Sequence, residues 1–143
     1  MKVFKSRSIA WLGVISAVAL VAAGCGSSSS NSTVGVTASS ITFGTHQPLT
    51  GPAAPGYSEI APASQAYFNY VNAHGGVYGR SIHLITKNDE YNPTNTVNVV
   101  HQLVLQEKVF GIFEGLGTPT HTKVVGFLNS SKIPDMFVAS GCP

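Results

Sequence analysis

Residues 109–120, VFGIFEGLGTPT, decide the fold of this chain. Residues 109–113 are almost wholly apolar, which predicts a strand that is buried on both faces of a parallel sheet. The loop after this strand contains two glycines, and Thr118-Pro119 then predicts the start of a helix, with Thr118 as the N-cap. A buried strand that leads through a glycine-containing loop into a helix is typical of α/β proteins.

The same alternation of strand and helix extends through most of the sequence. Further strands are expected at residues 41–45, 82–87 and 133–139. Helices are expected at residues 61–73, which Gly75-Gly76 would end, and after the cap-and-proline pairs Asn92-Pro93 and Thr118-Pro119. The apolar stripes expected to face the core are Ala63, Ala66, Tyr67, Tyr70 and Val71 in the first helix, Val97, Val100, Leu103 and Val104 in the second, and Val124, Val125 and Leu128 in the third. This order predicts an α/β fold with an open parallel sheet, right-handed crossovers and helices on both faces.

Composition and charge disfavour several classes of protein. The chain has 143 residues, of which 43% are hydrophobic and 10% charged, so it has room for one domain or for part of a larger one. Three of its eight basic residues precede the first apolar run, and the remainder has five basic against six acidic residues. A nucleic-acid-binding protein needs a clustered basic face, so we expect no nucleic-acid partner.

The sequence offers little support for metal or cofactor chemistry. Two cysteines, Cys25 and Cys142, are too few for a disulfide framework or a cysteine-based zinc site. The five histidines have no metal-ligand spacing and are expected on solvated surfaces or helix faces; they are His46, His74, His83, His101 and His121. We therefore expect neither a metal nor a cofactor.

The amino end has the pattern of an export signal. Residues 1–7 are basic, residues 9–23 are apolar and uncharged, and small residues lead directly into Cys25. This predicts a signal peptide at residues 1–24, because the apolar run is shorter than the roughly 20 residues that a bilayer-crossing helix needs. Residues 25–40 begin with a Gly/Ser-rich run, which predicts a flexible tether.

Signals for an enzyme are weak. Ser140 lacks the G-x-S-x-G elbow of a hydrolase nucleophile. Asp89 and Glu90 are adjacent on an expected loop, where carboxylates are usually solvated, and they would point to opposite sides. Cys142 is better explained by a partner cysteine or a buried thiol than by a nucleophile. We therefore expect a protein without catalytic activity.

Ligands of open α/β sheets bind beyond the carboxyl ends of the strands. The loop at residues 115–120 is the most informative there, because its glycines allow close approach of the backbone and a helix start favours an anion such as a carboxylate. The alternative is that Thr118 only caps its own helix, and the local sequence leaves both interpretations open. Tyr57 and Tyr91 are expected on loops at the same end.

Several motifs resemble those of a known family. Residues 41–44, ITFG, followed by residues 48–53, PLTGPA, are similar to the opening of the leucine-binding family of periplasmic-binding-protein-like receptors, which serve ABC transporters for branched-chain amino acids and amides. Residues 71–80, VNAHGGVYGR, resemble the family's segment between first helix and second strand, and residues 88–93 and 115–120 resemble its acidic loop and ligand loop. Residues 21–25, VAAGC, resemble the lipobox of bacterial lipoproteins, with Ala22 in a place that is usually Leu.

This resemblance implies two α/β lobes that close over a ligand, of which residues 41–143 would be the first lobe, incomplete. It implies an extracytoplasmic receptor for an amino acid or small amide, with ABC permease subunits as partners and a lipid on Cys25 as its only membrane attachment. The ligand's carboxylate and amino groups would be held by Thr118, Thr120, Ala139, Ser140 and Gly141, with Leu49, Thr50 and Gly51 in the loop after the first strand. A disulfide of some members would be absent, because Tyr91 and Gly117 stand at about its positions.

Two other functions remain as alternatives. One is an extracellular sensory module that binds a ligand and signals through a partner protein; the lipobox and the lack of a spanning helix weigh against it. The other is a fragment of a secreted α/β hydrolase, which the missing nucleophile elbow disfavours.

Overall fold

Four parallel strands form one sheet in residues 32–141, the part of the chain that the computed structural model describes. The strands are β1 (Ser40–Gln47), β2 (Ser81–Asn88), β3 (Gly111–Phe113) and β4 (Asp135–Met136). Their order is β2-β1-β3-β4, so the predicted open parallel sheet is confirmed. The predicted signal peptide at residues 1–24, Cys25 and Cys142 lie outside the described residues.

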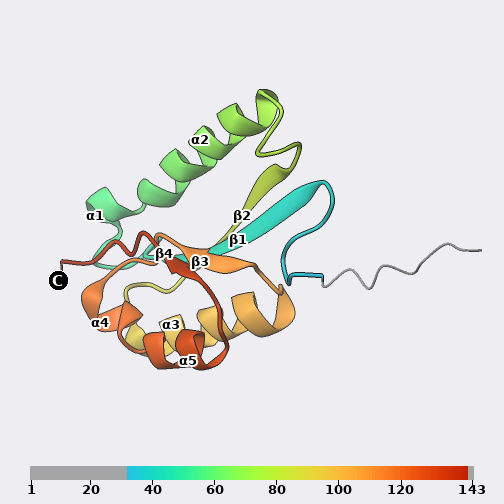
Figure 1. Ribbon diagram of the computed structural model, residues 1–143. Coiled ribbons are helices and arrows are strands. Elements are labelled where there is room, and N and C mark those ends of the chain that lie inside the picture. The colour runs from blue at the N-terminus through green and yellow to red at the C-terminus, as the bar shows by residue number, and fades with distance from the viewer. Residues whose placement is uncertain (1–31, 142–143) are drawn as a thin grey trace, which may run out of the picture. The chain divides into compact units, whose positions relative to one another are not determined.

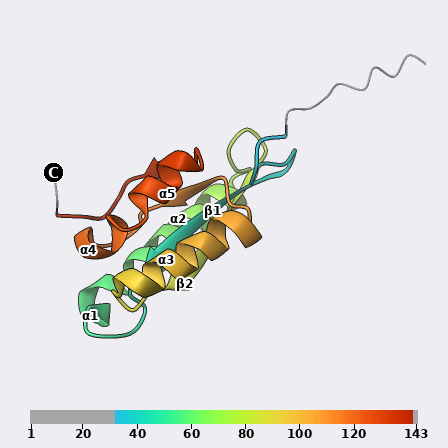
Figure 2. The same ribbon diagram turned by 90° about the horizontal axis from the view of Figure 1, so that it is seen from below.

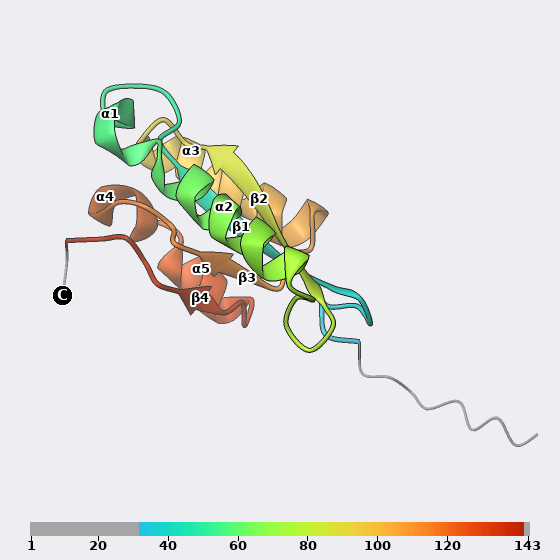
Figure 3. The same ribbon diagram turned by 90° about the horizontal axis from the view of Figure 1, so that it is seen from above.

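Helices cover both faces of this sheet, as expected. On one face lie α1 (Ala54–Tyr57) and α2 (Ile60–Ala73), and Figure 3 shows α2 lying along the sheet. On the other face lie α3 (Pro93–His101), its π-helical continuation η1 (Gln102–Gln106), α4 (Thr118–His121) and α5 (Val125–Ser130), as Figures 1 and 2 show. The predicted cap of α3 is confirmed, because the Asn92 side chain accepts hydrogen bonds from the N–H groups of Thr94 and Asn95.

The main core lies between the sheet and the helices α3, η1 and α5. Leu103 of η1 packs directly on Gly44 of β1, where an added Cβ would lie 2.9 Å from the leucine side chain. The stripe predicted for the second helix is therefore confirmed, with Val97 at its edge. The buried members of this core are Val100, Leu103, Val104, Val109, Ile112, Val124 and Leu128.

The other face of the sheet has an aromatic core, and here the predicted stripe of the first helix was wrong. Tyr67 and Tyr70 are 65% and 61% exposed, whereas Phe68 is buried. The Phe68 ring lies 6.5 Å from that of Phe43 in β1 and 5.2 Å from that of Phe113 in β3, measured between centroids. Because this one ring fills the space above the strands, α2 is rotated so that its tyrosines face outward.

The carboxyl-terminal elements are shorter than predicted. The strand expected at residues 109–113 begins only at Gly111, and Glu114, with φ +54°, turns the chain out of the sheet. The single helix expected after Thr118 is two short helices, and Val125 is 37% exposed although Val124 and Leu128 are buried. β4 pairs with β3 over two residues only, and Ala139 bridges separately to Leu116.

Candidate functional site

The carboxyl ends of the strands meet at one end of the sheet, and the strand order reverses between β1 and β3. β1 has β2 on one side and β3 on the other, so the connections that leave β1 and β3 diverge to opposite faces. Figure 1 shows α1, α4 and the last described residues gathered at this end. Ligands of open α/β sheets bind at such a position.

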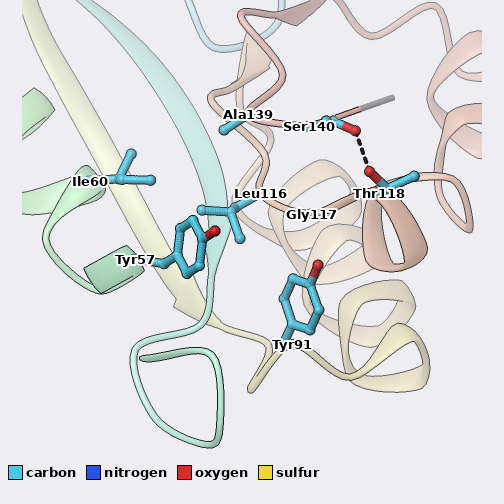
Figure 4. Close-up of a pocket in the computed structure, with 9 residues that line it drawn as sticks. Tyr57, Ile60, Tyr91, Leu116, Gly117, Thr118, Ala139 and Ser140 are labelled. Atoms are coloured by element: carbon cyan, nitrogen blue, oxygen red, sulfur yellow. Dashed lines mark hydrogen bonds between the residues drawn. The ribbon is translucent and has the colours of Figure 1, made fainter. Parts of the chain in front are cut away.

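A pocket of about 220 Å³ lies there (Figure 4). It is formed by residues of the three crossovers and by the segment after β4, and the side chains that line it within the described part of the chain carry no charge. The apolar part of the lining comes from aromatic rings and aliphatic side chains, and the polar groups are tyrosine, threonine and serine hydroxyls together with backbone. The lining residues are Tyr57, Ile60, Tyr91, Leu116, Gly117, Thr118, Ala139, Ser140 and Gly141.

Thr118 lines the pocket, but the prediction that it is an N-cap was wrong. Gly117 holds that position with φ +100°, a conformation that favours glycine, and Thr118 is the first helical residue. The Thr118 hydroxyl does not cap the helix and is hydrogen-bonded to the Ser140 hydroxyl at 2.7 Å (Figure 4). The N–H of His121 donates to the Gly117 carbonyl at 2.9 Å, so it is not open to a ligand.

Backbone hydrogen bonds join the two strand-end loops of the pocket into one wall. Gly117 N–H donates to the Ala139 carbonyl at 2.9 Å, and Ala139 N–H donates to the Gly115 carbonyl at 3.0 Å. Leu116 N–H donates to the carbonyl of His46 at 3.2 Å, which ties the same wall to β1. The wall is thus held by the fold without any ligand.

Four of the predicted ligand residues lie outside this lining. Thr120 is fully buried, and its hydroxyl donates to the carbonyls of Leu116 and Gly117, so it supports the loop from inside. Leu49 and Thr50 are held at the end of β1 by Asn88, which accepts from Leu49 N–H at 2.9 Å and donates to the Thr50 hydroxyl at 2.7 Å. Gly51 lies beside the Glu90 backbone.

The two loop tyrosines do reach the pocket, as expected. Tyr91 lies against Gly117, where an added side chain would overlap the tyrosine ring. These two residues stand at about the positions that a disulfide joins in some members of the resembling family, and they are neighbours here. The sequence reasoning missed Ile60 and Leu116. Leu116 could have been inferred, because it lies between the two glycines of the ligand loop.

Beneath the pocket wall lies a chain of four hydrogen-bonded side chains, Asp89–His46–His121–Asp135, of which the first three are buried, and this corrects two expectations. His46 and Asp89 are fully buried and His121 is 5% exposed, although all three were expected to be solvated or on a surface. The successive contacts are Asp89 Oδ2 to His46 Nδ1 at 2.8 Å, His46 Nε2 to His121 Nδ1 at 3.0 Å, and His121 Nε2 to Asp135 Oδ2 at 2.7 Å. Within residues 32–141 no three side chains of the metal-ligating types are grouped to hold an ion.

The surroundings of Asp89 lower the pKa of its carboxyl group. Burial by itself raises the pKa of its carboxyl group, but hydrogen bonds from His46, Tyr91 N–H and Thr96, together with the charge of His46, lower the pKa below its ordinary value. A signal for this pairing was present in the sequence: His46 and Asp89 stand at the carboxyl ends of strands that prove to be neighbours, with Gln47 opposite Asn88.

The comparisons with known proteins agree on one family. The sequence model of the family described as "Periplasmic binding protein" matches residues 40–142. A solved structure described as a fatty acid ABC transporter substrate-binding protein from Thermomonospora curvata is 32% identical, with a TM-score of 0.66 over 76% of this chain and 27% of that chain. A possible leucine/isoleucine/valine-binding protein from Rhodopirellula baltica SH 1 is 26% identical, with a TM-score of 0.68 over 73% of this chain and 28% of that chain.

A third solved structure widens the range of ligands among the similar proteins. It is a solute binding protein of an ABC transporter from Rhodopseudomonas palustris BisB5 in complex with 3,4-dihydroxy benzoic acid, 28% identical, with a TM-score of 0.56 over 70% of this chain and 27% of that chain. The chain therefore spans less than a third of the length of these structures. No curated protein matches. None of the helices in residues 32–141 has the length and apolar character needed to cross a membrane.

Proposed function

The chain belongs to the family of periplasmic binding proteins, and from this premise we propose that it forms one wall of a receptor that captures a small solute outside the cytoplasm for an ABC transporter. The family is extracytoplasmic, and the similar structures are described as solute-binding proteins. The partners of the whole protein would be the permease subunits of that transporter. Its role would be binding without catalysis.

The observation that carries this proposal is the pocket at the carboxyl ends of the strands. It combines the Thr118–Ser140 hydroxyl pair with the apolar side chains of Leu116 and Ile60. A hydroxyl can donate to a carboxylate, and apolar side chains favour a hydrocarbon group, so the lining suits an acid with an apolar body.

We propose a branched-chain amino acid or a related amino acid or amide as the solute. Its carboxylate would contact Thr118 and the segment Ala139, Ser140 and Gly141, and its side chain would lie toward Leu116. The compounds named for the similar proteins are leucine, isoleucine or valine, a fatty acid, and 3,4-dihydroxy benzoic acid, and all of them join a carboxyl group to a hydrocarbon chain or ring. That shared chemistry supports an acid and leaves the apolar body to be identified by experiment.

Closure of a second lobe over this wall would be the mechanism of capture. The solute would stabilise the closed form by its contacts with both lobes, and so shift an equilibrium that exists without it. Because the wall is already joined by hydrogen bonds between residues 115–117 and 139, the described half of the site would change little on binding.

The test is calorimetric titration of the full-length protein with leucine, isoleucine, a fatty acid and 3,4-dihydroxybenzoate. Thr118→Val removes a hydroxyl from the pocket and should weaken binding of the acid that binds by about 1–3 kcal/mol, since a charged group loses a hydrogen bond. Thr122→Val is the matched control, because Thr122 is exposed directly after α4 and its hydroxyl donates to the Pro119 carbonyl at 3.4 Å. Equal affinity of the Thr118 and Thr122 variants would assign Thr118 a structural role, and no binding of any acid would refute the ligand class.

We also propose that Cys25 carries the lipid that keeps the exported protein at the membrane. The support is the small-residue run before Cys25 and the Gly/Ser-rich run after it. Cys25→Ser should release the protein into the soluble extracytoplasmic fraction, as measured by immunoblotting of separated fractions. Retention of this variant in the membrane fraction would contradict the anchor.

A further inference from the structure

The side-chain series Asp89–His46–His121–Asp135 has three contacts, and each of them needs one hydrogen atom between its two heavy atoms. The distances of 2.8, 3.0 and 2.7 Å are those of hydrogen bonds. A neutral imidazole carries one N–H and a deprotonated carboxylate carries none. Two neutral histidines between two carboxylates therefore supply two hydrogens for three contacts.

The missing hydrogen is one additional proton. Asp89 is not its site, because its carboxylate also accepts from the Tyr91 N–H at 2.9 Å and from the Thr96 hydroxyl at 2.9 Å. The proton is left to the two imidazoles or to Asp135, and either placement satisfies all three contacts. Both placements give the four side chains a net charge of −1.

Without this proton one contact opposes two lone pairs. When His46 Nδ1–H donates to the charged Asp89 carboxylate, the opposed pair is either His46 Nε2 with His121 Nδ1 at 3.0 Å or His121 Nε2 with the Asp135 carboxylate at 2.7 Å. A buried polar atom without its hydrogen bond is destabilising, so the contact opens. In the first case α4 separates from β1, and in the second from β4, since His121 belongs to α4.

The backbone of Gly115 connects this chain to the pocket. A Cβ at Gly115 would lie 2.6 Å from His46 Nε2 and 2.7 Å from His121 Nδ1, so the glycine packs directly over the contact between the two imidazoles. Its carbonyl accepts from Ala139 N–H, and the next three residues line the pocket. A movement of either imidazole is therefore transmitted to both loops of the pocket wall.

We propose that Asp89, His46, His121 and Asp135 form a binding site for one proton, and that this proton holds residues 115–118 in the conformation that lines the pocket. His46 and His121 are positioning residues, because they act on the wall and do not line the pocket. The inference goes beyond the solute-binding role and does not depend on which solute is bound.

Other charged groups of the packed elements face elsewhere. The Glu114 carboxylate accepts from the Ser64 hydroxyl of α2, on the other face of the sheet. Lys87 of β2 pairs with Glu107 at 3.1 Å near the surface, and His101 of α3 packs on Phe127. His83 of β2 is exposed, and α5 has no titratable residue. Among the described residues, Asp89 and Asp135 are thus the titratable partners of the two imidazoles.

The decisive variant is Asp135→Asn, in which an N–H of the asparagine amide supplies the third hydrogen in place of the additional proton. An asparagine N–H can donate to His121 Nε2, His121 Nδ1–H then donates to His46, and His46 Nδ1–H donates to Asp89, all with neutral imidazoles. The Asp135 side chain is 21% exposed, so the change does not place a new group in the core. The matched control is Glu107→Gln, which removes an exposed carboxylate from another ion pair.

The measurement is NMR of the full chain, uniformly labelled with nitrogen-15, between pH 5 and 10 and without ligand. In the wild type and in Glu107→Gln, the ring nitrogens of His46 and His121 should lose one proton in a single shared step. The amide signals of Gly117 and Ala139 should shift with the same midpoint. In Asp135→Asn the step should be absent from pH 6 upward, with the amide signals constant.

Three results would overturn the proposal: no shared step in the wild type, amide signals of Gly117 and Ala139 that do not follow it, or the same step in Asp135→Asn. Should that variant fail to fold, the wild-type titration decides alone, through the first two of these results. None of these signals depends on an added solute, so failure of the solute-binding proposal would leave this test intact.

Discussion

Gly115→Ala tests how tightly the pocket wall packs on the buried histidines. The new methyl carbon would lie 2.6 and 2.7 Å from the two facing imidazole nitrogens, whereas ordinary contact begins at 3.4 Å. The loop is held by its own backbone hydrogen bonds, so we expect the rings to retreat by about 0.7 Å, which lengthens the 3.0 Å contact between His46 and His121 beyond hydrogen-bond range. Overpacking costs about 1–3 kcal/mol and an unsatisfied buried polar atom about 1–3 kcal/mol, so we expect a loss of about 2–6 kcal/mol in unfolding free energy.

Gly126→Ala makes the same chemical change at a position with open space. A Cβ at Gly126 of α5 meets no atom within 4 Å, and alanine is a better helix former than glycine, so this variant should gain about 0.5–1 kcal/mol. Urea denaturation of both variants, followed by circular dichroism at neutral pH, measures the difference. A Gly115→Ala protein within about 0.5 kcal/mol of the wild type would refute the close packing of the wall on the histidines.

Two further predictions concern the core and the response to acid. Leu103→Ala should lower the unfolding free energy by about 2–5 kcal/mol in the same urea assay, because Leu103 is fully buried on Gly44. Leu105 is 61% exposed, so Leu105→Ala should change the unfolding free energy by less than about 0.5 kcal/mol. Equal losses would contradict the placement of η1. The lowered pKa of Asp89 stabilises the folded state above the ordinary carboxyl pKa of about 3.9, and this stabilisation is lost as the pH falls through the lower folded-state value. Asp89→Asn should therefore flatten the fall in unfolding free energy below about pH 4. An unchanged acid profile would contradict this assignment.

The strand and helix order was predictable because local signals agreed with the tertiary structure. The apolar residues before Glu114, the cap at Asn92 and the paired glycines after α2 each define an element or its end without reference to distant residues. The π-helical turn of η1 was not predictable from a period of 3.6 residues, although the burial of Leu103 and Val104 was.

The buried face of α2 could not be identified from its own sequence. A stripe of alanine and tyrosine satisfies helical spacing as well as the stripe that includes Ala61 and Phe68. The choice depends on Phe43 and Phe113 from two separate strands, whose rings leave space for the Phe68 ring. Hydrophobic periodicity alone does not contain this information, because it counts tyrosine as apolar even where its hydroxyl remains in water.

The pocket was predictable to the extent that it follows from topology. Parallel strands bring their carboxyl ends together, so Thr118 and residues 139–141 were expected at one place and the structure brings them to one pocket. The direction of each side chain within a loop was not predictable. Gly117, with its positive φ, takes over the N-cap position, which turns the Thr118 hydroxyl toward Ser140 and leaves Thr120 inside.

The histidine chain shows why the end of this sheet is not simply apolar. Hydrocarbon side chains of similar volume could hold β1, α4 and β4 together with equal or greater stability, since buried charged groups lose much of their hydration energy. Apolar contacts, however, do not fix the rotation of one element about another, whereas three hydrogen bonds in series define where His121, and with it the start of α4, lies relative to His46 and Asp135. A wall that must present Thr118 and the Gly117 backbone to a solute in one orientation needs this directional constraint. The polar series of side chains accordingly lies under residues 115–118, whereas the purely apolar cluster lies under α3 and α5.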